Sequence, residues 1–363
     1  MTSKKSSRQL EDKTKDRQRP KHNEAKSWAR EWMDAIIFAG IAALIIRALF
    51  LEAYRIPTPS MESTLLTGDF LLVSKMHYGA RSPMSLGIPF TGLHIRGLEL
   101  PWFRLPGFMD VKRNDIVVFN YPIDDKVVSQ KTNYIKRAVA IPGDTVSIEN
   151  KRLFINGQPS ESEEFNTLEQ NYIVEARERL RLSPTRVRTA GANIVQSRGE
   201  RYLMNMTEEV AAVIEGWAEV VDVQPYILPE DHNDYARQPF TFASGFEGNH
   251  HNLDPIVVPF EGQVVTLTED NWHQYRDIIV RYEKNQVQQS GNDFRINGVP
   301  TNEYTIRQDY YFMMGDSRDN SEDSRFWGYV PENHVVGRAF LIYFSWDSER
   351  YLPRFGRIFN LIH

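Results

Sequence analysis

Ser60 is the first residue of this 363-residue chain whose surroundings suggest chemistry. It lies in residues 56–61 (IPTPSM), nine positions after an apolar stretch that ends at Leu51. A serine hydroxyl is a weak nucleophile and needs a neighbouring base. Nine residues reach at most about 30 Å. If the apolar stretch spans a bilayer, any chemistry at Ser60 therefore takes place close to the membrane surface.

Histidine is the usual base for a serine, but the histidines of this chain give no clear candidate. Of the nine, none lies in a tight polar motif except the pair His250-His251. A solvated loop is the simpler interpretation of this pair, because no further ligand stands at metal-binding spacing. The chain has no cysteine, which excludes a thiol nucleophile, disulfides and thiolate metal sites. We therefore predict neither a metal site nor a cofactor. The histidines are His22, His77, His94, His232, His250, His251, His273, His334 and His363.

A desolvated lysine is the other base available to a serine, because burial lowers the pKa of the amine. The best candidate is Lys136, in residues 133–144 (NYIKRAVAIPGD). Its neighbours are apolar for a lysine in a predicted strand, and Arg137 would point to the opposite face. A lysine in a strand is more commonly a surface charge, so this pattern alone does not separate the two interpretations.

The apolar stretch at residues 32–51 (WMDAIIFAGIAALIIRALFL) is long enough to span a membrane as a helix. Its two charges, Asp34 and Arg47, lie near its ends and can reach the headgroups. Residues 1–30 carry a net charge of +6, while the rest of the chain carries −11. This basic flank predicts a cytoplasmic tail at 1–31, with everything after Leu51 on the other side. A nucleic-acid-binding tail and a buried helix of a soluble domain are the alternatives, whereas the long basic segment disfavours a cleaved signal peptide.

From residue 52 onward most segments are typical of β-strands. Asn-Gly pairs at 156–157 and 297–298 predict hairpin turns. Residues 168–182 and 208–220 favour helices, the second with Thr207 as its N-cap. Strands are predicted at residues 69–73, 115–119, 145–148, 153–157, 256–258, 264–267 and 334–346.

These elements predict a mainly β fold in which a β-rich core is interrupted by an inserted α+β domain and preceded by one N-terminal transmembrane helix. The core would comprise residues 52–158 and 301–363, and the inserted domain residues 159–300. Two unrelated hairpins at the Asn-Gly turns are the alternative. Residues 77–112 and 350–359 are rich in aromatic side chains and are either packed or in contact with lipid. For the first segment, which includes Phe90, Trp102, Phe103 and Phe108, we favour lipid.

Four blocks occur in order along the chain: residues 59–65 (PSMESTL) followed by Gly68-Asp69, 114–119 (NDIVVF), 134–146 (YIKRAVAIPGDTV) and 314–328 (MGDSRDNSEDSRFWG). The last block is specific, and a solvated acidic loop or a calcium-binding loop explains it poorly. Together with the apolar stretch, the blocks resemble the type I bacterial signal peptidases, a family of membrane-anchored Ser/Lys endopeptidases.

This resemblance implies a catalytic role for three residues. Ser60 would be the nucleophile, and Lys136 the general base that deprotonates it and later protonates the leaving amine. Thr58 would assist the backbone N–H of Ser60 in an oxyanion hole.

The resemblance also implies supporting residues in the last block. Ser321 would orient the lysine amine, Asp323 and Arg325 would form an ion pair that shapes the site, and Gly315 and Asp316 would support the loop. Two positions depart from the family pattern: Ser63 stands where proline is common, and Ser317 where asparagine is common.

The implied reaction is hydrolysis of the peptide bond after the signal sequence of exported preproteins, on the extracytoplasmic face of the bacterial cytoplasmic membrane. The implied partners are preproteins and the lipid bilayer, without nucleic acid. A soluble self-cleaving repressor shares the Ser/Lys chemistry but not the apolar stretch. A catalytically inactive, membrane-tethered scaffold that binds partners through the inserted domain is the alternative function.

Overall fold

The computed structural model describes residues 28–82, 84, 100–160, 168–229, 231–348 and 350–362. The chain divides into two compact units, residues 1–47 and 48–363. Helix α2 (Trp28–Leu49) accounts for the described part of the first unit. It has 22 residues and is long and apolar enough to cross a membrane. The helix begins and ends slightly earlier than the predicted span at 32–51.

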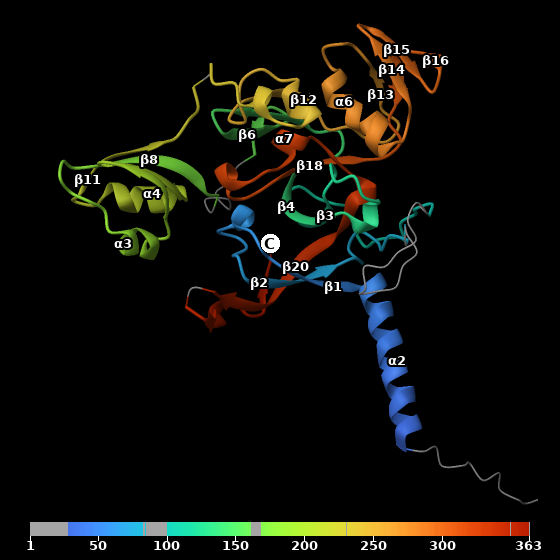
Figure 1. The fold of residues 1–363 in the computed structure, drawn as a ribbon, viewed down its shortest axis with the longest axis horizontal. Helices are drawn as coiled ribbons and strands as arrows, with labels where there is room; N and C mark the ends of the chain where they lie inside the picture. The colour runs from blue at the N-terminus through green and yellow to red at the C-terminus, as the bar shows by residue number, and fades with distance from the viewer. Residues whose placement is uncertain are drawn as a thin grey trace, which may run out of the picture. The chain divides into compact units, whose positions relative to one another are not determined.

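The second unit is built on a nine-stranded antiparallel sheet, which confirms the mainly β prediction (Figure 1). The strand predicted at 334–346 is β20, and it lies between β2 and β3 in this sheet. Apolar residues of both faces are buried, including Val73, Val117 and Ile342. In sheet order the strands are β1 (Leu51–Arg55), β2 (Asp69–Ser74), β20 (Val335–Asp347), β3 (Ile116–Asn120), β4 (Asn133–Ala140), β18 (Tyr310–Met314) and β19 (Val330–Pro331), with β21 (Leu352–Pro353) and β22 (Asn360–Leu361) paired to β20.

Three smaller sheets and several short helices complete the core. Both Asn-Gly turns form hairpins as predicted, because Asn156, Gly157, Asn297 and Gly298 all adopt positive φ. The sheets contain β12 (Leu253–Val257), β5 (Thr145–Glu149), β6 (Arg152–Ile155) and β7 (Gln158–Pro159); β13 (Val264–Thr266) and β17 (Glu303–Thr305); and β14 (Val287–Ser290), β15 (Asp293–Ile296) and β16 (Val299–Pro300). The helices are η2 (Pro59–Met61), η3 (Val128–Gln130), η5 (Tyr235–Arg237), α5 (Thr241–Ser244), α6 (Trp272–Arg276), η6 (Asp277–Tyr282), η7 (Arg318–Asn320), α7 (Ser324–Trp327), η8 (Glu332–His334) and η9 (Phe355–Arg357).

Residues 168–225 form a four-stranded antiparallel sheet with its own two helices, which we call the βαββαβ module. Its strand order, β11-β8-β10-β9, and its element order are those of the split βαβ motif. The helices α3 and α4 lie on one face of the sheet (Figure 1). Its elements are β8 (Gln170–Ala176), α3 (Pro184–Thr189), β9 (Asn193–Arg198), β10 (Arg201–Met206), α4 (Glu208–Glu215) and β11 (Val220–Pro225).

The helix predicted at residues 168–182 is wrong, because residues 170–176 form strand β8. Tyr172, Val174 and Ala176 are buried and alternate with more exposed residues, so the apolar period is two rather than 3.6. The second predicted helix begins as expected: the Thr207 side chain accepts a hydrogen bond from the Val210 N–H. It ends at Glu215, earlier than predicted.

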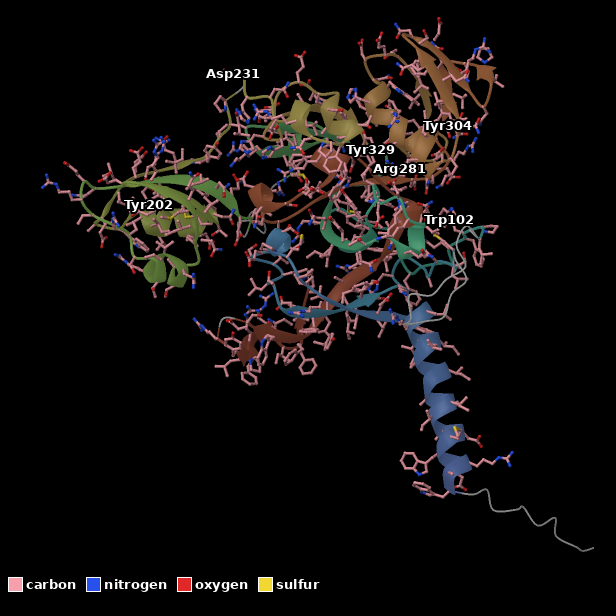
Figure 2. All side chains as sticks on the ribbon, viewed as in Figure 1. Trp102, Tyr202, Asp231, Arg281, Tyr304 and Tyr329 are labelled. Atoms are coloured by element: carbon pink, nitrogen blue, oxygen red, sulfur yellow. The ribbon has the colours of Figure 1, made fainter. Side chains whose placement is uncertain are left out.

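The segment predicted as one insert packs in two different ways. The βαββαβ module has a separate hydrophobic cluster that includes Tyr202. In contrast, residues 253–306 share a cluster with β4, β5, β6 and β18, to which Tyr304 and Tyr329 belong (Figure 2). The boundaries at residues 159 and 300 stay a prediction.

Candidate active site

Ser60 lies on the short helix η2, in the loop between β1 and β2. Pro59 occupies the first position of this helix, where its fixed φ favours helical geometry. The Glu62 N–H donates to the Pro59 carbonyl (2.9 Å), and the Leu65 N–H donates to the Met61 carbonyl (2.7 Å). Because Met61 and Leu65 are fully buried, the loop is anchored directly after Ser60.

Lys136 lies on β4, between β3 and β18, with its side chain 3% exposed. Its Nζ is 2.5 Å from Ser60 Oγ, so the structure brings together the two residues singled out in the sequence. Burial lowers the pKa of the Lys136 amine to about 8, although Asp323 and Asp316 oppose this effect. A neutral amine at this distance can accept the proton of the serine hydroxyl.

The carboxylates nearest to Lys136 are paired with arginines. Arg325 donates to Asp323 from Nε (2.8 Å) and Nη2 (2.9 Å). Arg137 donates to Asp316 from Nε (2.8 Å) and Nη2 (2.7 Å). Both pairs are buried. Within the described residues, Lys136 forms no salt bridge with a carboxylate, and its amine faces the serine hydroxyl instead.

Besides pairing with Arg325, Asp323 also binds the loop after β18. The Gly315 N–H donates to Asp323 Oδ2 (3.1 Å). A Cβ at position 315 would stand 2.5 Å from the Ser60 carbonyl oxygen and still closer to Ser321 Oγ. Glycine is therefore required for this close approach. This is the loop-supporting place that we predicted for Gly315.

Two other predicted site residues, Ser321 and Thr58, differ in their exposure to solvent. Ser321 is buried beside Gly315, but its hydroxyl has no hydrogen-bond partner among the described residues. Its role in orienting the amine stays a prediction. Thr58 precedes η2 and is exposed, so its hydroxyl is open to solvent.

Ser63, one of the two departures from the family pattern, adopts a φ of +77°. Proline cannot reach this angle, because its ring holds φ near −65°. The Ser63 hydroxyl is buried without a hydrogen-bond partner among the described residues. The loop after Ser60 therefore has a backbone conformation that a proline at position 63 would exclude.

The prediction that His250-His251 lies in a solvated loop is wrong for His251, which is 2% exposed. Its Nδ1 accepts from the Leu228 N–H (2.9 Å), and its Nε2 is 3.1 Å from Asp319 Oδ1. Burial lowers the pKa of His251 to about 4, so it is neutral near pH 7. Distant segments create this environment, which a local sequence pattern does not reveal.

His250, His251 and Asp319 lie close enough together to suggest a metal site, but their contacts do not fit one. Both ring nitrogens of His251 are engaged, and the Lys151 amine donates to Asp319 (2.7 Å). A second cation at Asp319 would be repelled by this ammonium.

Sequence reasoning missed one buried ion pair and one buried acid near Ser60. Arg137 and Asp316 were not expected as a pair, although an arginine in an apolar strand signals the need for a carboxylate. Glu169, in the βαββαβ module, contacts the loop at 316–318. No local signal identifies Glu169, because its partner is 148 residues away.

The two aromatic segments are partly exposed. Phe103 and Phe108 have exposed side chains, as do Tyr351, Phe355 and Phe359 near the C-terminus. Phe90 lies outside the described residues. Contact with lipid stays a prediction for both segments.

Comparison with known proteins identifies the family to which this chain belongs. Residues 29–212 and 257–346 match the family described as "Signal peptidase, peptidase S26". The chain is 26% identical to a signal peptidase I of Pseudomonas fluorescens over 328 residues, which cover 87% of this chain and 73% of that protein. It is 27% identical to a signal peptidase I of Pseudomonas aeruginosa over 333 residues (88% and 74%). It is 25% identical to a signal peptidase I of Helicobacter pylori over 365 residues (93% and 92%). The chain therefore belongs to the signal peptidase family, peptidase S26.

Proposed function

We propose that Ser60 is the nucleophile and Lys136 the general base of this signal peptidase. The observation that supports this most strongly is the 2.5 Å separation of Lys136 Nζ and Ser60 Oγ, both within buried side chains. The pKa of about 8 for the amine leaves part of the population neutral at neutral pH. General bases work best when their pKa lies near the working pH.

The proposed reaction has two steps. In the first, Lys136 takes the proton of Ser60 Oγ while the oxygen attacks the carbonyl carbon of the scissile bond. The resulting ammonium then gives this proton to the leaving amine, and an acyl ester remains on Ser60. In the second, Lys136 accepts a proton from water as the water attacks the ester. The ester bond to Ser60 Oγ then breaks, the Lys136 ammonium returns its proton to this oxygen, and the signal peptide leaves as a carboxylic acid.

The Ser60 N–H and the Thr58 hydroxyl are the proposed donors to the oxyanion. Preorganised donors of this kind typically contribute about 3–4 kcal/mol to transition-state stabilisation. Ser321, Asp323 and Arg325 are the proposed supporting residues. By pairing with Asp323, Arg325 keeps this carboxylate from forming an ion pair with the Lys136 amine, which would hold the amine in its charged form.

The proposed substrates are exported preproteins, cut after their N-terminal signal sequences. We test this by incubating the detergent-solubilised chain with a preprotein whose signal ends in Ala-X-Ala. Wild type should cleave it and Ser60→Ala should not, while Ser290→Ala, an exposed serine on β14, should match wild type. Cleavage by Ser60→Ala would refute Ser60 as nucleophile. Failure of wild type to cleave would favour the inactive scaffold.

The proposed location is the bacterial cytoplasmic membrane, with α2 as a single-pass anchor, residues 1–27 in the cytoplasm and residues 50–363 outside it. The net charge of +6 in residues 1–30 supports this orientation. Because the chain has no cysteine, single cysteines can report topology. In intact spheroplasts, a membrane-impermeant maleimide should label Ser290→Cys but not Ser6→Cys. The reverse labelling would overturn the orientation.

A further inference from the structure

The βαββαβ module is joined to the active-site loop by its first residues. The Glu169 N–H donates to the Asp316 carbonyl (3.0 Å), and the Arg318 N–H donates to the Glu169 carbonyl (2.8 Å). Glu169 and Ser317 thus form an isolated parallel β-bridge. The backbone of the module holds three consecutive residues of the loop that leads to Ser321.

The Glu169 side chain reinforces this bridge. Ser317 Oγ donates to Glu169 Oε2 (3.2 Å), and it lies 3.4 Å from Asn205 Oδ1 on strand β10 of the module. Ser317 is fully buried and Glu169 is 7% exposed. Both polar groups are therefore removed from water, and the Glu169 carboxylate is the nearer of the two acceptors of the Ser317 hydroxyl.

The bridged segment also contacts the nucleophile. The Ser317 N–H donates to the carbonyl oxygen of Ser60 (3.2 Å). On the other side, Arg325 Nη2 donates to the Arg318 carbonyl (2.5 Å), which links the segment to the Asp323–Arg325 pair. Ser317 thus stands between Glu169 of the module and the backbone of Ser60.

The charges around Glu169 show that its carboxylate does not serve ordinary ion pairing. Burial, together with the nearby carboxylates of Glu62 and Asp316, raises the pKa of Glu169 to about 7, against which the Ser317 hydrogen bond acts. A buried acid beside two others is unfavourable for stability. Its hydrogen bond with Ser317 explains why a glutamate stands at position 169.

We propose that Glu169 is a positioning residue of the peptidase, which acts through Ser317 to hold residues 316–318 against the Ser60 backbone. The inserted module is then part of the machinery that fixes the geometry of the site. This inference rests on the proposed roles of Ser60 and Lys136.

The test compares purified full-length variants in the preprotein cleavage assay, with kcat and KM measured separately. Glu169→Ala and Ser317→Ala should each lower kcat by roughly tenfold or more, because each leaves a buried polar partner unsatisfied, while KM changes less than threefold. The double variant should be no slower than the slower single variant, since both remove the same contact. Glu169→Gln keeps an acceptor for Ser317 and should restore kcat to within about threefold of wild type. Glu175→Ala, an exposed acid on the same strand β8, is the matched control.

The proposal is overturned if Glu169→Ala has the kcat of Glu175→Ala, or if the losses of the two single variants multiply in the double variant. If Glu169→Ala does not fold, Ser317→Ala and Glu169→Gln decide the question. The proposal is supported if kcat falls tenfold in Ser317→Ala and recovers in Glu169→Gln. It is refuted if Ser317→Ala has the kcat of wild type. If Ser60→Ala is inactive and Glu169→Ala is fully active, only the proposed role of Glu169 is refuted. If Ser60→Ala is active, the proposed Ser60–Lys136 dyad is refuted.

Discussion

Lys136 and Lys151 are both buried but have different partners. Lys136 faces the Ser60 hydroxyl at 2.5 Å, and burial lowers its pKa to about 8. Burial also lowers the pKa of Lys151, but Asp319 at 2.7 Å opposes this lowering. The difference shows that burial alone does not prepare a lysine for catalysis. The carboxylates around it must be occupied by other cations.

The regions around the two lysines also differ in how completely their polar groups are hydrogen-bonded. Asp319 accepts hydrogen bonds from Lys151, His251 and the Asn171 N–H (2.6 Å), and its pKa lies far below the usual range despite burial. Around Ser60, the hydroxyls of Ser63 and Ser321 are buried without partners among the described residues. Buried hydroxyls without partners therefore lie beside Ser60, whereas the Asp319 carboxylate accepts several hydrogen bonds.

Exchange of each lysine for arginine gives the largest expected contrast. Lys136→Arg should lower kcat by about 10⁴-fold or more, because a guanidinium stays protonated and cannot accept the Ser60 proton. Lys151→Arg keeps a cation beside Asp319 and should retain activity to within several-fold. Rates of preprotein cleavage under saturating substrate measure both. An active Lys136→Arg would remove the neutral-amine mechanism and, with it, the distinction between the two lysines.

Removal of the carboxylate should expose the structural character of the second region. Asp319→Ala leaves the Lys151 charge buried and unpaired, so the free energy of unfolding should fall by roughly 3–5 kcal/mol. Urea unfolding followed by tryptophan fluorescence measures this change. Asp254→Ala removes an exposed acid from β12 and should shift the free energy by less than about 0.5 kcal/mol. Equal stability of the two variants would contradict the structural role of Asp319.

The pH dependence of activity sharpens the comparison for Lys136. Because its pKa is lowered to about 8, the neutral fraction of the amine rises about tenfold per pH unit below that value. We therefore expect kcat/KM to rise with unit slope up to about pH 8 and then to level off. The Lys126→Arg variant, which changes an exposed lysine, should keep the same profile. A flat profile between pH 6 and 8 would contradict a lysine base.

The sequence was sufficient to single out Ser60 and Lys136, which the structure brings together, and to predict much of the β core. Ser60 and Lys136 lie in two of the four ordered blocks, and several strands of the core were recognisable as β-type segments. The Asn-Gly turns at 156–157 and 297–298 were predictable because their positive φ values depend on the two residues themselves.

The rest depended on contacts between distant residues. Strand β8 was mistaken for a helix because its charged neighbours concealed the alternation of Tyr172, Val174 and Ala176. His251 was expected in solvent, since nothing adjacent to it announces Asp319, 68 residues later. The Glu169–Ser317 contact joins the module to the block at 314–328 across 148 residues, and no periodicity or spacing encodes such a pairing.

Ser63 gives the smallest expected effect and tests whether the positive φ in the loop after Ser60 is strained. A non-glycine residue at a φ of +77° is held in an unfavourable conformation, and glycine relieves this at the expense of greater freedom in the unfolded chain. The buried, unpartnered hydroxyl is also removed. Ser63→Gly should therefore raise the free energy of unfolding by up to about 1 kcal/mol.

The opposite substitution provides the control for Ser63. Ser63→Pro cannot adopt positive φ, so the loop after Ser60 must rearrange and both stability and kcat should fall. Urea unfolding and the cleavage assay measure both variants together. A stable and fully active Ser63→Pro would show that this loop takes the ordinary conformation in solution. Because Lys151 also adopts a positive φ (+71°), backbone strain does not separate the two regions, and the partner of each lysine is the difference that matters.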